Sequence, residues 1–237
     1  AIGAGTADWI SRRAPASLRV SPFAYFLPGR DAILTGRAPG ALRLVFVGAL
    51  IRRKRVDLLL TVLAELAGHA FTLEVVGDGE ERERLEKQAG ELLPGRVSFV
   101  GTLGMAAAVA RIAAADCLVL PSDHDGWGAV VSEAQINGTP VVCSSECGAA
   151  VTVRSSGEGG VFAAGCADAL RSALAKVLTD GPIGTPRRER LAGWARCLTA
   201  ACGAEYLLAI LAANAGRGDP VRPPWEWQAA VNGIPDR

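Results

Sequence analysis

From residue 42 onward, short apolar runs rich in β-branched residues alternate with stretches long enough to form helices. The runs begin near residues 42, 71, 96, 116, 139 and 159, as LRLVFVG, FTLEVVG, RVSFVG, DCLVLPS, TPVVCS and GGVFAAG. Continuous apolar strands separated by helices are typical of a parallel sheet covered on both faces. The pattern predicts an α/β fold, a doubly wound, Rossmann-like parallel sheet of about six strands over residues 42–180.

The stretches between the runs carry helical signals. Residues 57–68 place Leu58, Val62 and Leu66 on one face, and residues 80–93 form a charged stretch with acids in the first turn. Residues 105–115 and 167–178 also have a helical pattern. In the flanks, residues 1–41 lack a sustained period and predict a linker, and residues 181–237 predict a long, interrupted helix at 187–216 and an irregular tail rich in Pro and Trp.

Composition excludes several classes of function. Twenty-five Lys and Arg residues against 24 Asp and Glu give a net charge of +1, so no global field recruits nucleic acid or anionic lipid. The apolar runs are too short to span a bilayer, and no secretion signal is recognisable. Six scattered cysteines and two histidines, with no CxxC pair, exclude a zinc site and predict free, mostly buried thiols. Such thiols indicate a reducing cytoplasm.

Ligands of an open parallel sheet bind beyond the carboxyl ends of its strands. The turns after the first three runs therefore supply candidate site residues, namely Gly48 and Lys54, Gly77 and Gly79, and Gly101 and Thr102. Lys54 lies within a basic cluster that could instead be a solvated turn, although the phosphate role is favoured, and the Gly77–Gly79 segment could be only a tight turn.

The segment after the fourth run, PSDHDGWGAVVSEAQINGTPVV, is the most informative in the chain. It predicts a loop that becomes a helix at about Trp127 or Gly128. Gly126 and Gly128 leave amide groups uncovered at the helix N-terminus, which makes an anion site. Asp125 and Glu133 can face the same cleft, where carboxylates accept hydrogen bonds from sugar hydroxyls. A diphosphate at the helix and Lys54, with hydroxyls on the acids, describes a nucleotide-sugar.

These residues resemble the donor-binding half of the retaining family 4 glycosyltransferases (glycosyl transferases group 1), which have the two-domain GT-B fold. The matching motifs are Gly48-Ala49-Leu50 followed by Lys54, Val76 to Gly79, Pro121 to Gly128 with Glu133, and Gly138 to Val142. They occur in the family's order over about three fifths of the chain.

The resemblance implies a role for each matching residue. Lys54 would hold the leaving diphosphate, Glu133 the ribose hydroxyls and Asp125 the transferred hexose, and these three are the expected catalytic residues. The remaining donor-binding residues would be Gly48, Arg53, Gly77, Gly79, Gly101, Thr102, Gly126, Trp127, Gly128, Ala129 and Val130. Donors would be UDP- or GDP-sugars, transferred with retention of configuration. No metal or other cofactor is implied, since Lys54 and the helix dipole neutralise the developing charge.

Two departures from the family pattern concern the site. Ala49 stands where the family has a phosphate-binding arginine, and Arg52, Arg53 and Arg55 are the candidates to replace it. Asp125 stands where the family has a glutamate one methylene longer, and the neighbouring Trp127 replaces a phenylalanine.

The family's acceptor domain has no counterpart before Leu42. Residues 1–41 are therefore expected to be an interdomain connector or a remnant of a missing N-terminal acceptor domain, with PFAYFLPG at 22–29 as the connector. Alone, the chain is expected to bind donor but to transfer sugar poorly. The acceptor would be a glycan or lipid-linked molecule, and the absent half could associate with the inner face of the membrane.

Two other functions remain open from the sequence. A degenerate or regulatory domain could hold a nucleotide-sugar without transferring it, which Ala49 favours. A nicotinamide-dependent oxidoreductase could have the same sheet, although residues 1–5, AIGAG, lack the third glycine and the preceding strand of a dinucleotide fingerprint. Trp225 and Trp227 in the tail predict packing onto the body more than a partner motif.

Overall fold

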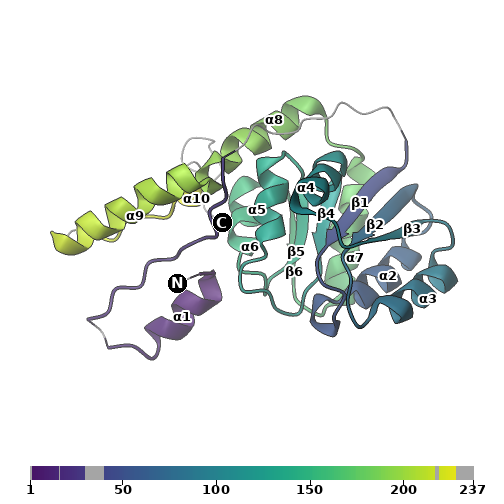
Figure 1. Ribbon diagram of the computed structural model, residues 1–237, viewed down its shortest axis with the longest axis horizontal. Coiled ribbons are helices and arrows are strands. Elements are labelled where there is room, and N and C mark those ends of the chain that lie inside the picture. The colour runs from purple at the N-terminus through teal and green to yellow at the C-terminus, as the bar shows by residue number, and fades with distance from the viewer. Residues whose placement is uncertain (1, 16, 30–39, 217–218, 228–237) are drawn as a thin grey trace.

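The computed structural model of the chain describes residues 2–15, 17–29, 40–216 and 219–227. Its centre is a six-stranded, all-parallel sheet in the order β3-β2-β1-β4-β5-β6 (Figure 1). The strands are β1 (Leu42–Val47), β2 (Phe71–Val76), β3 (Val97–Gly101), β4 (Cys117–Leu120), β5 (Val141–Ser144) and β6 (Gly159–Phe162). The predicted α/β fold class, with a doubly wound, Rossmann-like sheet, is confirmed.

The central strands are apolar because both of their faces are covered. Side chains of β1, β4 and β5 such as Phe46, Leu118 and Val142 are completely buried. β1 pairs in register with β2 from Leu42 opposite Phe71, and an irregularity in the β2–β3 pairing follows Val75. The sheet is thus a rigid platform whose strands all end at one edge, where the connecting loops gather.

Helices cover both faces of the sheet (Figure 1). Helix α2 contacts both α3 and α7, α4 packs against α5, and α5 contacts α8. Their bounds are α2 (Val56–Glu65), α3 (Arg82–Leu92), α4 (Met105–Ala114), α5 (Ala129–Ile136), α6 (Ala150–Ser156), α7 (Ala167–Asp180) and α8 (Thr185–Trp194). The predicted helices at 57–68, 80–93, 105–115 and 167–178 are confirmed to within a few residues at each end.

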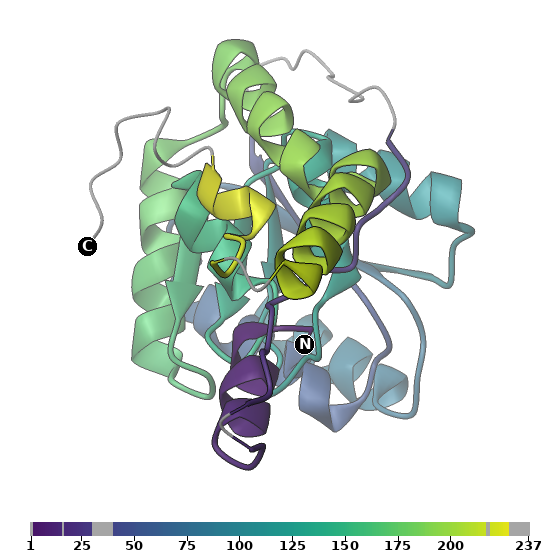
Figure 2. The same cartoon turned by 90° about the vertical axis from the view of Figure 1, so that its left-hand side faces the viewer.

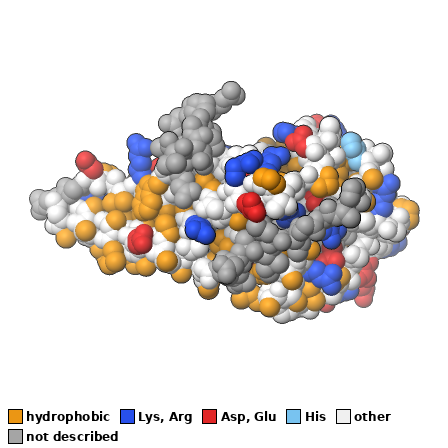
Figure 3. Space-filling view, turned by 90° about the horizontal axis from the view of Figure 1, so that it is seen from above, with side chains coloured by type: hydrophobic (Ala, Val, Ile, Leu, Met, Phe, Trp, Pro, Cys, Tyr) orange, Lys and Arg blue, Asp and Glu red, His pale blue; other side chains and the backbone are white. Residues whose placement is uncertain are grey.

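The long helix expected at 187–216 is interrupted, as predicted. Helix α8 leads into a 3-10 turn, η2 (Ala195–Leu198), and α9 (Ala200–Ala215) then extends away from the sheet, at the left of Figure 1. Leu207, Leu208 and Leu211 of α9 are 45%, 66% and 55% exposed. Figure 3 shows this protruding part of the molecule with many apolar side chains on its surface.

The N-terminal flank contains a helix, α1 (Ala4–Ser11), that its irregular sequence does not predict. An isolated bridge between Ile2 and Phe23 joins its start to the following extended segment. At the other end, a short tail helix, α10 (Pro224–Trp227), returns to the body and contacts η2, α6 and α9 (Figure 2). Residues 30–39 of the expected connector and 228–237 of the expected tail lie outside the described residues.

None of the helices in the described ranges combines the length and the apolarity that a membrane span requires.

Candidate functional site

Two loops meet at the carboxyl edge of the sheet, one after β1 and one after β4. The first loop contains a 3-10 turn, η1 (Arg52–Lys54), and the second leads into α5. β1 and β4 are neighbours in the sheet. The strands β2 and β3 follow on the outer side of β1, whereas β5 and β6 follow on the outer side of β4. This reversal of strand order is the place where open α/β sheets bind their ligands.

The two loops bring Lys54 and Asp125, which were expected to hold the diphosphate and the sugar of one donor, into direct contact. Lys54 Nζ donates to Asp125 Oδ2 at 2.5 Å, and Ser122 Oγ lies 3.4 Å from the same carboxylate oxygen. The Lys54 and Asp125 side chains are only 13% and 14% exposed. A charged pair this sheltered from water is much more strongly coupled than a surface pair.

The other basic residues of the first loop are used to hold the second loop. Arg53 Nη1 donates to the His124 carbonyl at 2.6 Å, and Arg55 Nη1 donates to Asp123 Oδ1 at 2.9 Å. The Asp123 amide in turn donates to the Arg53 carbonyl at 2.8 Å. These contacts fix the chain immediately before Asp125.

No arginine takes the place of Ala49 in the described part of this loop. Ala49 is exposed, and Arg53 and Arg55 are held by the second loop. The third candidate, Arg52, reaches Glu81 at 3.4 Å with its side chain 89% exposed. Lys54 is therefore the cation that lies at the centre of the site.

The far side of the Asp125 loop is fixed by the loop after β5. The Asp125 amide donates to the Glu146 carbonyl, and the Gly148 amide donates to the Asp125 carbonyl, both at 3.0 Å. One residue further, the Ala149 amide and the Cys147 thiol donate to the carbonyl of Trp127 at 2.8 and 3.0 Å. The loop is thus bound on both sides by backbone contacts.

Helix α5 begins at Ala129, one or two residues later than predicted, and Gly128 is its N-cap. Gly128 has φ 81°, a left-handed conformation that favours glycine. The first amides of a helix have no acceptor inside the helix, and the helix dipole favours an anion there. Ala129, Val130 and Glu133 are half-buried on this helix, which keeps Glu133 one turn beyond the anion position.

Glycines let the neighbouring loops approach closely. A Cβ on Gly77 would lie 1.9 Å from the Gly48 carbonyl oxygen, and one on Gly79 would lie 2.4 Å from that of Leu50. The β1 loop thus already fills the space that a side chain at Gly77 or Gly79 would need. Close packing alone therefore explains why glycine stands at both positions. Gly101 has φ 73°, and Thr102 after it is exposed.

Trp127 points away from the surface. Its side chain is 1% exposed, its indole N–H donates to Ser132 Oγ at 3.0 Å, and its ring lies 5.9 Å from that of Trp225. If Trp127 contacts a ligand, the contact is made by its backbone.

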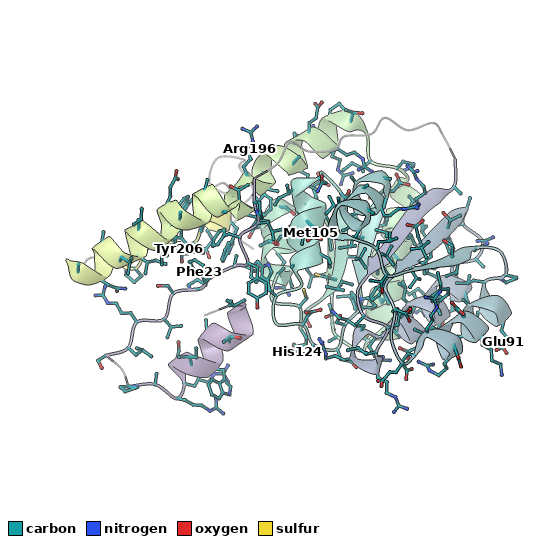
Figure 4. The ribbon with its side chains drawn as sticks, viewed as in Figure 1. Phe23, Glu91, Met105, His124, Arg196 and Tyr206 are labelled. Carbon is teal, nitrogen blue, oxygen red and sulfur yellow. The ribbon has the colours of Figure 1, made fainter. Side chains whose placement is uncertain are left out.

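A cavity of about 400 Å³ opens beside Asp125, toward the β5 loop and α1. Its volume lies in the range of small-molecule sites. His124, which lines it, lies in Figure 4 at the edge of the sheet body on the side facing α1. Sequence reasoning missed the contributions of α1 and of the β5 loop, because no motif marks them. The lining residues missed are Gly3, Thr6, Trp9, Ser145, Glu146, Cys147, Gly148, Ala150, Val151 and Arg154.

Two buried thiols of the central strands have raised pKa values. Four of the six cysteines are buried and all six are free. Burial raises the pKa of Cys117 to about 12, and a hydrogen bond with Cys147, together with burial, raises that of Cys143. In the described ranges, no three His, Cys, Asp or Glu side chains are grouped closely enough to hold a metal ion.

Comparison with known proteins gives relatives of one kind. The lipopolysaccharide core biosynthesis glycosyltransferase LpsE of Rhizobium meliloti is 32% identical over 145 residues, which are 61% of this chain and 42% of the relative. A D-inositol 3-phosphate glycosyltransferase of Thermomonospora curvata is 34% identical over 188 residues, 70% of this chain and 43% of the relative. The chain thus spans less than half the length of these two relatives.

Solved structures show the same fold. The apo form of the lipopolysaccharide outer core galactosyltransferase WaaB has a TM-score of 0.75 at 19% identity, over 99% of this chain and 61% of that one. Anabaena HepE in complex with UDP and glucose has a TM-score of 0.60 at 22% identity, over 73% and 49%. The family profile for glycosyl transferases group 1 matches residues 35–196, more than half of the chain. The chain therefore belongs to the glycosyl transferases group 1 family, whose GT-B architecture the sequence motifs predicted.

Proposed function

We propose that the chain binds a nucleotide-sugar in the crevice between the β1 and β4 loops and positions it for transfer of the sugar. The observation that carries the proposal is the sheltered Lys54–Asp125 pair, beside the N-terminus of α5 and a cavity of about 400 Å³. A cation, a helix N-terminus and an acid at one place match the diphosphate and the hydroxyls of such a donor.

Each group has a distinct task in the proposed reaction. Lys54 and the first amides of α5 stabilise the diphosphate as negative charge develops on it, which is the largest protein contribution. Asp125 accepts hydrogen bonds from hydroxyls of the sugar, and Glu133 accepts those of the ribose. The carbon–oxygen bond between the sugar and the diphosphate breaks, the acceptor hydroxyl oxygen bonds to the same carbon, and the hydroxyl proton passes to the departing diphosphate. None of these tasks requires a metal or other cofactor.

The finer features of the donor follow the family resemblance. We propose a hexose carried by UDP or GDP and transferred with retention of configuration. HepE, of the same fold, has been solved with UDP and glucose. The cavity beside Asp125 has room for the sugar, and its exposed lining residues Glu146 and Arg154 supply hydrogen-bonding groups.

The acceptor would bind at the part of the site that faces α1. We propose a glycan or lipid-linked acceptor that approaches Asp125 from the cavity side, with a further domain completing its binding surface. The lengths of the curated relatives, of which this chain spans less than half, support a contribution from outside these residues.

A second candidate is a domain that holds a nucleotide-sugar without transferring it. It is favoured by exposed Ala49 at the family's phosphate-binding arginine and by the engagement of Arg53 and Arg55 elsewhere. The family match favours both of these functions over a nicotinamide-dependent oxidoreductase.

Calorimetric titration with UDP, GDP, their glucose and mannose conjugates, and NAD tests the proposal. We expect one nucleoside diphosphate and its sugar conjugate to bind, with NAD showing no heat above that of dilution. Lys54→Ala should abolish most of this binding, whereas Lys176→Ala, which removes a lysine of α7 paired with Asp180, should leave it unchanged. Affinity for NAD alone, or equal binding by both variants, would contradict the proposal.

A further inference from the structure

The C-terminal tail reaches the loop that carries Asp125. Helix α10 contacts both η2 and α6 and lies on the side of the molecule that faces the viewer in Figure 2. Trp225 of this helix is 2% exposed, and its ring lies 5.9 Å from the ring of Trp127 at an interplanar angle of 48°. Two fully buried indoles, about a hundred residues apart in sequence, therefore pack against each other two positions after Asp125.

Trp127 is well placed to transmit this contact. Its carbonyl accepts from Ala149 and Cys147, and its indole N–H donates to Ser132 inside α5. It also directly precedes Gly128, the left-handed N-cap of the helix. Movement of the Trp127 ring would thus displace Asp125 on one side and the N-terminus of α5 on the other.

The tail itself is held by contacts that do not involve the site. The Trp227 indole N–H donates to the Arg222 carbonyl at 2.7 Å, and its ring meets Tyr206 of α9 edge-on at 6.1 Å. Tyr206 is fully buried, and its hydroxyl donates to the Pro22 carbonyl at 2.9 Å. Helix α10 also contacts η2 and α6, so its position does not depend on the Trp227 contact alone, and Trp225 is the residue that reaches Trp127.

We propose that Trp225 is a positioning residue, which through Trp127 holds the Asp125 loop and the start of α5 in the geometry that a donor needs. The expected effect on donor binding rests on the proposed function, whereas the effect of Trp225 on the structure of the Asp125 loop is independent of that function.

Hydrogen exchange of the unliganded protein tests the structural part. The amides of Asp125, Gly148 and Ala149 are bonded across the loop, so Trp225→Ala should raise their exchange rates by about tenfold or more. The Leu118 amide, bonded to the Pro140 carbonyl at the start of β4, should keep its rate within about twofold, as expected of a core strand. Trp225→Phe, which keeps a ring, should restore most of the protection.

Trp227→Ala is the matched control. It removes an indole of the same helix that is 39% exposed and contacts Tyr206 rather than the loop. It should leave exchange at Asp125, Gly148 and Ala149 close to wild type. Unchanged loop exchange in Trp225→Ala, or an equal rise at Leu118 and in the loop, would overturn the proposal. If Trp225→Ala does not fold, Trp225→Leu gives the same comparison with more of the volume kept.

Titration with UDP and GDP tests the consequence for the site. Whichever nucleotide binds the wild type should bind Trp225→Ala about tenfold more weakly, because small displacements of positioned groups are costly. Trp227→Ala should bind it as the wild type does. If the wild type binds neither nucleotide, the proposed function fails while the exchange result still decides the role of Trp225. Equal affinity of Trp225→Ala and wild type would reject a role in donor binding.

Discussion

The Lys54–Asp125 ion pair predicts an opposite effect of one substitution on two ligands. If Lys54 holds a diphosphate, its ammonium group has to leave or share the Asp125 carboxylate, 2.5 Å away, when the donor binds. Replacing Asp125 by asparagine removes that competition with almost no change of shape. Asp125→Asn should therefore strengthen the binding of a nucleoside diphosphate while it weakens the added contribution of the sugar.

The magnitude follows from the shelter of the pair. Both side chains are less than one sixth exposed, and a charge-assisted hydrogen bond contributes a net 1.5–3 kcal/mol, about a tenfold or larger factor in affinity. Since Lys54 can keep part of the contact, we expect diphosphate affinity to rise about tenfold in Asp125→Asn. In a Lys54→Ala background, the same substitution should have no such effect.

Calorimetry on the four proteins of this cycle measures the coupling between Lys54 and Asp125 directly. The uncharged nucleoside is the control ligand, because it lacks the diphosphate and should respond to neither substitution. The reasoning is refuted if diphosphate and nucleoside affinities change by the same factor in Lys54→Ala. It is also refuted if Asp125→Asn weakens diphosphate binding.

Four further predictions follow from single positions. Glu133→Ala should weaken nucleotide binding by about tenfold and spare inorganic diphosphate, since the lost contacts are to ribose hydroxyls; calorimetry with both ligands decides this, and equal losses would contradict it. Ala49→Arg should tighten diphosphate binding by about tenfold, because an exposed position can carry the added charge without steric cost. Unchanged diphosphate affinity would show that an arginine at this position does not contact the diphosphate. Gly128→Ala should lower the free energy of unfolding by about 1–3 kcal/mol, since φ is 81° and the new Cβ would lie 2.8 Å from a thiol sulfur. Gly126→Ala, with open space around its Cβ, should change this free energy by less than about 0.5 kcal/mol, and urea unfolding compares the two variants. Burial raises the pKa of Tyr206 to about 12, so the stability that its neutral phenol contributes is complete below pH 10 and is lost as pH rises toward 12. The difference in unfolding free energy between wild type and Tyr206→Phe should shrink over that pH interval. A constant difference would argue against this contribution of Tyr206.

The sheet was predictable because its strands are buried on both faces. Residues 44–47 and 141–143 are apolar throughout, and the helices between the strands follow from length and periodicity. That Lys54 and Asp125 lie at one edge of the sheet was predictable because both follow neighbouring strands, whereas their direct ion pair was not predicted.

Other parts of the site depend on contacts that no local pattern encodes. Arg53 and Arg55 read as a basic cluster suited to phosphate, yet each is held by one residue of the β4 loop, 68 to 71 positions away. Helix α1 is short and irregular in sequence, and its place beside Gly126 depends on a close approach of Gly3. Such contacts are long-range, so they emerge only from the assembled fold.

The leucines on the outer side of α9 have a practical consequence for every measurement suggested above. Three large apolar side chains, about half exposed, project from a helix that stands clear of the body. Neighbouring molecules that meet along this helix remove those side chains from water, so concentrated samples should self-associate. Sedimentation velocity at several loading concentrations should precede the titrations, and Leu208→Gln offers a more dispersed preparation with an unaltered sheet edge.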